Sequence, residues 1–182
     1  MTDINICKDF AVMQFKELRN EILDIKIRII KLQVIGISTI PIIVGVGEKY
    51  DITAVLMVGP LITLTFGFML IFEQGSLMRV GEYIKDIIEP VLTDKRFIGW
   101  EAWLQQDKRR RRAEIFFAWS VHIAFAVYFA LTTWLAYNAI YKEIGQLVAV
   151  SGLGLYCGGF LITMYLLITN LRIGTGVSSQ SG

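Results

Sequence analysis

The sequence predicts an all-α membrane protein whose four transmembrane helices form two hairpins, and three observations carry this prediction. The chain has 182 residues, 54% of them hydrophobic, and a mean hydropathy of +0.55. These values are too apolar for an ordinary soluble domain. The charged residues are sorted into blocks instead of being spread along the chain. Four apolar runs lie between the blocks, each close to the ~20 residues that cross a bilayer core.

The leader, residues 1–28, is amphipathic. Its apolar side chains recur at alternating steps of four and three residues, the a/d pattern of a coiled coil. These residues, which continue into the first apolar run, are Ala11, Phe15, Leu18, Ile22, Ile25, Ile29 and Leu32. The pattern predicts an oligomer seam between copies, and isoleucine at both a and d favours three or four strands. The alternative is a helix that lies on the membrane surface or packs against the central segment of its own chain.

The apolar runs pair into two hairpins with short turns. The first hairpin, 29–72, holds runs 29–47 and 52–72, and the second, 115–171, holds runs 115–137 and 145–171. Of the 18 Lys and Arg residues, only Lys49 and Lys142 lie in the two turns. Because positive charge collects on the cytoplasmic side, we expect both termini and the central segment in the cytoplasm. The expected location is the inner membrane of a bacterium.

The central segment, 73–114, is the one long polar stretch between apolar runs. We expect Ser76 to cap a first helix that Pro90 ends or kinks. A second helix should place Trp100, Trp103 and Leu104 on one face. Both helices have the composition of elements at the inner headgroup layer. The small, polar residues 172–182 predict a flexible tail.

Five consecutive basic residues close the central segment: Lys108, Arg109, Arg110, Arg111 and Arg112. The first interpretation of this run is a membrane anchor that contacts anionic lipid. A site for an anionic cytosolic ligand, such as a nucleotide, is the alternative. Nucleic acid is disfavoured because no recognisable fold or aromatic platform accompanies the basic run.

A polar layer within the membrane is a candidate functional site. Counted from the cytoplasmic ends of the four runs, Ser38, Thr65, His122 and Thr163 fall at similar depths. His122 shares a face with three small residues spaced by four, which predicts that it points towards protein. The small residues are Ala118, Ala126 and Ala130. The layer predicts hydrogen bonds between helices or the lining of a pore or proton path. Haem ligation by His122 would require two subunits.

Prolines and glycines predict bends and close contacts in the runs. Pro41 and Pro60 lie at matching depth in the first two runs and are candidate kinks. Gly154 and Gly158 form a GxxxG pattern, which is typical of closely packed membrane helices.

The sequence contains no grouping that predicts catalysis. No Asp, Glu, Lys or Arg lies in the middle of an apolar run, whereas coupled transporters and intramembrane enzymes usually need one there. We therefore expect neither an enzyme nor a cofactor. The four-run size resembles that of small multidrug transporters, whose first-span carboxylate has no counterpart here.

The leading functional expectation is a homo-oligomeric channel, pore or membrane-perturbing effector gated through segment 73–114. In architecture the chain resembles small multi-span membrane components of bacterial anti-phage systems. That resemblance implies a cytosolic signal or protein partner that triggers membrane damage. The alternatives are a membrane-anchored sensor or scaffold that recruits a cytosolic partner and, third, a small transporter.

Overall fold

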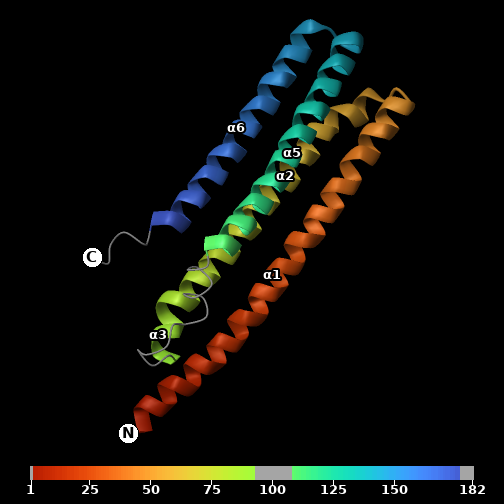
Figure 1. Ribbon diagram of the computed structural model, residues 1–182. Coiled ribbons are helices and arrows are strands. Elements are labelled where there is room, and N and C mark those ends of the chain that lie inside the picture. The colour runs from red at the N-terminus through yellow and green to blue at the C-terminus, as the bar shows by residue number, and fades with distance from the viewer. Residues whose placement is uncertain (1, 93–107, 177–182) are drawn as a thin grey trace. The chain divides into compact units, whose positions relative to one another are not determined.

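The computed structural model describes residues 2–92 and 108–176, with side chains over 9–92, at Phe116 and over 119–169. The elements are α1 (Thr2–Lys49), α2 (Thr53–Tyr83), η1 (Ile84–Ile88), α3 (Glu89–Leu92), α5 (Lys108–Glu143) and α6 (Gln146–Gly176) (Figure 1). The predicted helix around Trp100 and the tail residues 177–182 lie outside the described residues.

Four helices are long and apolar enough to cross a membrane. They span Asp9–Lys49, Thr53–Leu92, Trp119–Glu143 and Gln146–Thr169. The prediction of an all-helical chain with four such helices is thereby confirmed. The side of the membrane on which each terminus lies stays a prediction.

The leader and the first apolar run form one helix instead of two elements. α1 is continuous over 48 residues, Thr2–Lys49. Its first glycine is Gly36 and its only proline is Pro41, so nothing in the leader breaks the backbone hydrogen bonding. Hydropathy therefore located the apolar run but did not locate a helix end.

The central segment begins inside α2, and the expected helix start at Ser76 is wrong. Helical structure runs from Thr53 through η1 to Leu92. The π-helical turn η1 ends two residues before Pro90, and Glu89 N–H donates to Ile84 O, five residues back. Because Pro90 lacks an N–H and its ring crowds the carbonyl four residues earlier, the wider turn keeps the helix going. Pro90 thus loosens the helix and does not end it.

Two turns reverse the chain. Asp51 has φ of 52° in the first and Gly145 has φ of 114° in the second. Ile52 N–H donates to Gly47 O at 2.9 Å, and Gly145 N–H donates to Ile140 O at 3.2 Å. These bonds capture carbonyls at the helix ends. Aspartate tolerates the left-handed conformation, and glycine adopts it freely.

The chain divides into two compact units. Unit 1 contains Met1–Ile29 and Glu73–Trp119, and unit 2 contains Ile30–Phe72 and Ser120–Gly182. Two of the boundaries, after Ile29 and after Phe72, fall within one residue of predicted ends of the first hairpin. In unit 2, both turns lie at the same end, uppermost in Figure 1.

Unit 2 is held by close contacts between its helices. The rings of Phe129 and Phe160 stack with centroids 4.9 Å apart, and Tyr156 donates its hydroxyl proton to Met57 O at 2.8 Å. Gly36 lies so near Phe125 that an added Cβ would come within 2.8 Å of the ring. Glycine and aromatic residues therefore interlock in this unit, as expected where helices pack without a hydrophobic driving force.

Candidate functional site

The polar layer divides into two residues that meet inside unit 2 and two that point outwards. Ser38 and Thr65 are exposed. Ser38 Oγ donates to Val34 O at 2.8 Å, and Thr65 Oγ1 donates to Leu61 O at 2.8 Å. Because the hydroxyl protons are bonded within the helix, each hydroxyl can lie in an apolar environment without the desolvation cost of an unpaired donor.

His122 and Thr163 line one cavity between α2, α5 and α6. The cavity measures about 40 Å³, and Thr63 supplies its third polar side chain. Thr63 is 2% exposed, and the Nε2 atom of His122 is buried. Phe125, Phe129 and Phe160 also line the cavity, among other apolar side chains.

The cavity is suited to water. Thr63 Oγ1 donates to Gly59 O at 3.0 Å, and Thr163 Oγ1 donates to Gly159 O at 2.9 Å. Because both hydroxyl protons are used within their helices, the oxygens can only accept from a guest. The volume holds one or a few water molecules. A hydrated ion needs more space than this cavity offers. The lining of a pore by the polar layer stays a prediction.

The small-residue face around His122 is shorter than the spacing by four predicts. Ala126 lines the cavity beside His122, whereas Ala130 is exposed. A step of four residues overshoots one turn by ~40°, so two steps carry the side chain ~80° around the helix. Ala118 lies in α5, but its side chain is not among those described.

Thr63 was not predicted as a site residue, although the spacing of small residues around it in the sequence indicates a contact face. Gly59, Thr63 and Gly67 form a row of small residues on α2 at steps of four. A Cβ added to Gly59 would lie 3.4 Å from Thr132, and one added to Gly67 would lie 3.9 Å from Thr163. The row marks the face of α2 that meets α5 and α6, and this face excludes Thr65.

The GxxxG residues do not make the glycine contacts within the chain. A Cβ added to Gly154 or to Gly158 would meet nothing within 4 Å. Gly159 is the tight position, since its added Cβ would lie 2.8 Å from Leu64 Cδ1. A helix-contact role for Gly154 and Gly158 stays a prediction, and it would involve lipid or another copy.

The two candidate kinks lie inside continuous helices. Pro41 is exposed in α1, and Pro60 is fully buried in α2. The basic run Lys108–Arg112 forms the first turn of α5, and its side chains are not among those described. Positive charge at a helix N-terminus is electrostatically unfavourable, so helix stability does not explain the run. Its contact with lipid or ligand stays a prediction.

In unit 1, a bidentate ion pair joins the two segments. Arg28 donates from Nε to Glu73 Oε1 at 3.0 Å and from Nη2 to Glu73 Oε2 at 3.1 Å. The hydrogen bond that Arg28 donates to Glu73 raises the pKa of Arg28, and an arginine guanidinium is charged at physiological pH. Each residue is the charge nearest to one end of the first hairpin: Arg28 directly before it and Glu73 directly after it.

The predicted oligomer seam is largely buried within the single chain. Ile22 is 6% exposed and Ile25 is 1% exposed, and Phe15, Leu18, Ile29 and Leu32 are half-buried. On the central segment, Ile84 and Ile88 are likewise buried. This arrangement matches the alternative in which the leader packs against its own chain. The use of this seam between copies stays a prediction.

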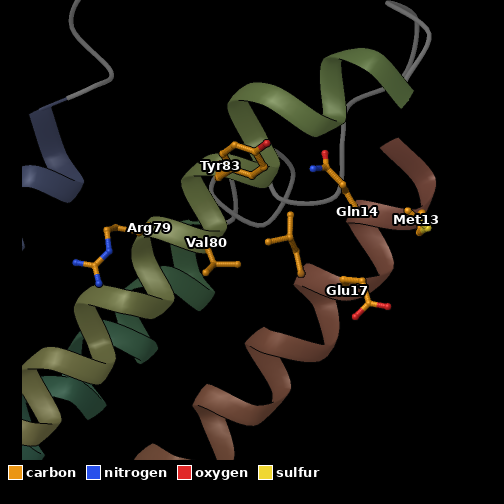
Figure 2. A pocket seen from close by; sticks show the side chains of 7 residues that line it. Met13, Gln14, Glu17, Arg79, Val80 and Tyr83 are labelled. Carbon is orange, nitrogen blue, oxygen red and sulfur yellow. The ribbon is translucent and has the colours of Figure 1, made fainter. Parts of the chain in front are cut away.

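An open groove remains between the two segments of unit 1 (Figure 2). Its volume is about 480 Å³, and its lining residues are Met13, Gln14, Glu17, Leu18, Arg79, Val80 and Tyr83. The groove is mainly apolar, with charged side chains at its edges.

The fold and these sites define the class of protein as an all-helical chain with four helices suited to crossing a membrane. Among the described residues, no three His, Cys, Asp or Glu side chains are grouped to hold a metal ion. No family model, curated protein or solved structure matches the chain.

Proposed function

We propose that this protein is a homo-oligomeric membrane channel or pore, with its path between copies and with unit 1 as the cytoplasmic control element. The observation that carries the proposal is the exposure of two of the four apolar helices. Only 11% of the most apolar stretch is buried in Asp9–Lys49, and the same share is buried in Gln146–Thr169. Helices so little covered by their own chain have room for neighbouring copies.

Small and hydroxyl-bearing residues on the exposed faces support this arrangement. Ser38 and Gly45 lie on the exposed face of α1, and Ser151 and Gly154 lie on that of α6. Small residues allow helices to approach closely. The serine hydroxyls donate to their own helices, Ser151 Oγ to Leu147 O at 2.9 Å, and keep lone pairs that can accept from water. A path lined in this way would be neutral and weakly polar.

The interior of a single chain favours a path between copies. The cavity beside His122 measures about 40 Å³ and is lined by three phenylalanine rings. A hydrated ion does not fit such a space, so a path within one chain would require its core to open. A path between copies requires only that exposed faces meet.

Control through unit 1 follows from the continuity of α1. The helix that supplies the leader of unit 1 also supplies Ile30–Lys49 of unit 2. A cytosolic signal that shifts or rotates the leader acts on the first span through the same backbone. The architectural resemblance to anti-phage membrane components suggests a role for this control. In that role, the cytosolic signal opens the path and the open path damages the membrane.

Flux from liposomes tests the proposal. Purified protein should release entrapped potassium or a small dye at some voltage or pH, and Ser38→Leu or Ser151→Leu should reduce the flux. Ile42→Leu, at a position 64% exposed on α1, is the matched control and should leave the flux unchanged. Absence of flux at every voltage and pH, from the wild type and from an Arg28→Ala variant with unit 1 loosened, would contradict the proposal.

A further inference from the structure

The groove of unit 1 exposes large apolar side chains next to charged ones. Met13 is 57% exposed and Tyr83 is 41% exposed, while Leu18 and Val80 form its half-buried floor. Met13 precedes the first apolar run by sixteen residues, or ~24 Å of helix. At that distance from the predicted span, we expect the side chain to lie in water. Exposed apolar surface in water marks an interaction site.

The charges at the edges of the groove have opposite signs on opposite helices. Glu17 lies on α1 and Arg79 lies on α2, and both side chains are exposed. Figure 2 shows Arg79 directed to one side of the groove and Glu17 to the other. The Arg79 guanidinium donates to Ser76 Oγ at 3.0 Å on its own helix. An incoming surface therefore meets an acidic edge beside α1 and a basic edge beside α2.

A second copy of the chain has the complementary surface. The bilayer holds all copies in the same orientation, so two copies are related by a two-fold axis along the membrane normal. That rotation places α1 of each copy over α2 of the other. The acidic edge of each groove then faces the basic edge of its partner, and the apolar floors meet.

The heights of the two charges agree with this pairing. Arg28 and Glu73 lie level with each other because they are hydrogen-bonded. Glu17 is eleven residues from Arg28, ~16 Å along the helix, and Arg79 is six residues from Glu73, ~9 Å. The axial difference of ~7 Å is within the combined reach of an arginine and a glutamate side chain.

We propose that the unit 1 groove is the contact between two copies of this chain, with Glu17 of each copy paired with Arg79 of the other. This inference rests on the homo-oligomeric assembly proposed above and names the surface that builds it. Within each chain, Ile22 and Ile25 of the heptad seam are buried, whereas Leu18 lies in the floor of the groove, so the groove presents the surface available to a second copy. The interface is self-complementary, as a two-fold contact requires.

Charge reversal tests the pairing in the full-length protein. In Glu17→Arg homodimers, two arginines oppose each other at both contacts, and in Arg79→Glu homodimers two glutamates do. Each variant alone should co-purify with a differently tagged copy of itself at least ~5-fold less than the wild type does, because like charges across an interface repel. Lys16→Glu, an exposed residue of α1 outside the groove lining, is the matched control and should pair normally.

Co-expression of the two variants on differently tagged chains gives the decisive result. In a mixed pair, the arginine introduced at position 17 of one chain faces the glutamate introduced at position 79 of the other. At the second contact, the native Arg79 faces the native Glu17, so opposite charges meet at both contacts. Mixed pairs should therefore recover to near the wild-type yield. Recovery between chains that fail to self-associate would not arise from a contact within one chain or from a different protein in the groove.

Three results would overturn the inference. They are single variants that self-associate like the wild type, mixed variants whose co-purification does not recover, and a wild-type protein that is monomeric by native mass spectrometry. Flux measured on the same samples separates this inference from the proposed function. Flux that persists in variants that do not pair would support the channel and contradict the groove as the contact between copies. Pairing of the wild type without flux would support the groove contact and contradict the channel.

Discussion

Unit 1 and unit 2 are built from the same long helices but are stabilised in different ways. In unit 2 the helices interlock through glycine and aromatic residues, with Gly36 against Phe125 and Phe129 against Phe160. In unit 1 a bidentate ion pair joins two segments, and an open groove remains beside them. We infer from this difference that the apolar surroundings expected for unit 2 favour helices whose backbones approach closely. The aqueous surroundings expected for unit 1 allow charge pairing, and apolar surface exposed there is available to partners.

The largest effect should come from filling a close glycine contact between two helices of unit 2. Gly36→Leu forces a side chain against the Phe125 ring, whose Cζ lies 2.8 Å from the added Cβ, and against Phe66 at 3.3 Å. Overpacking of this kind destabilises by about 1–3 kcal/mol. Thermal unfolding in detergent measures it. Gly45→Leu is the control on the same helix, since nothing lies within 4 Å of its Cβ, and equal losses for both variants would contradict the interlocking account.

The ion pair of unit 1 should give the next largest effect. Glu73→Ala removes both acceptors of the Arg28 guanidinium and should lower the melting temperature by about 2–4 °C. Exchange of the two residues, Arg28→Glu with Glu73→Arg, should restore most of the loss. A variant pair that stays as destabilised as the single change would show that the charges do not act on each other.

Removal of one hydrogen bond in unit 2 should have a smaller effect. Tyr156→Phe deletes the donor to the part-buried Met57 O, and the loss of this hydrogen bond costs about 1 kcal/mol. Tyr165→Phe is the matched control, because Tyr165 is 67% exposed. Chemical unfolding of both variants gives the comparison, and an unchanged Tyr156→Phe protein would mean that water replaces the bond.

The two threonines of α2 should give the smallest but most selective effect. Thr63→Val replaces a cavity-lining hydroxyl with a methyl group and should destabilise by about 0.5–1 kcal/mol. Thr65→Val should be neutral, because Thr65 is exposed and lies outside the cavity lining. A larger loss of stability for Thr65→Val than for Thr63→Val in unfolding measurements would contradict the placement of Thr63 in the cavity.

Much of the fold could be predicted from the sequence, because hydropathy and turn chemistry are local. The apolar runs located four helices that are long and apolar enough to cross a membrane. Of the two turn residues, Asp51 lies in the first predicted turn, whereas Gly145 is the first residue of the fourth predicted run. Helix ends could not be predicted in this way. Apolar composition ends with the run, but helical hydrogen bonding extends beyond it, as in α1. Helical structure also extends past Pro90, where the π-helical turn η1 accommodates the missing N–H.

The candidate site was predictable only in depth. Counting residues from the ends of the runs placed His122 and Thr163 together, but depth does not specify which side of a helix a residue occupies. Thr65 and Thr63 differ by two residues and therefore by ~200° around the helix, so only Thr63 reaches the cavity. The GxxxG pattern likewise does not specify the close contact within the chain, which lies at Gly159, one residue beyond Gly158.

The most direct test of this division between two surroundings uses two exposed positions on one helix. Leu23 in unit 1 is 58% exposed, and Ile42 in unit 2 is 64% exposed. In a background without Cys7 and Cys157, single cysteines at these positions are treated with a water-soluble maleimide in inside-out vesicles. The account predicts rapid labelling of Leu23→Cys and little labelling of Ile42→Cys, because lipid covers only the second. Equal labelling of the two positions would contradict it.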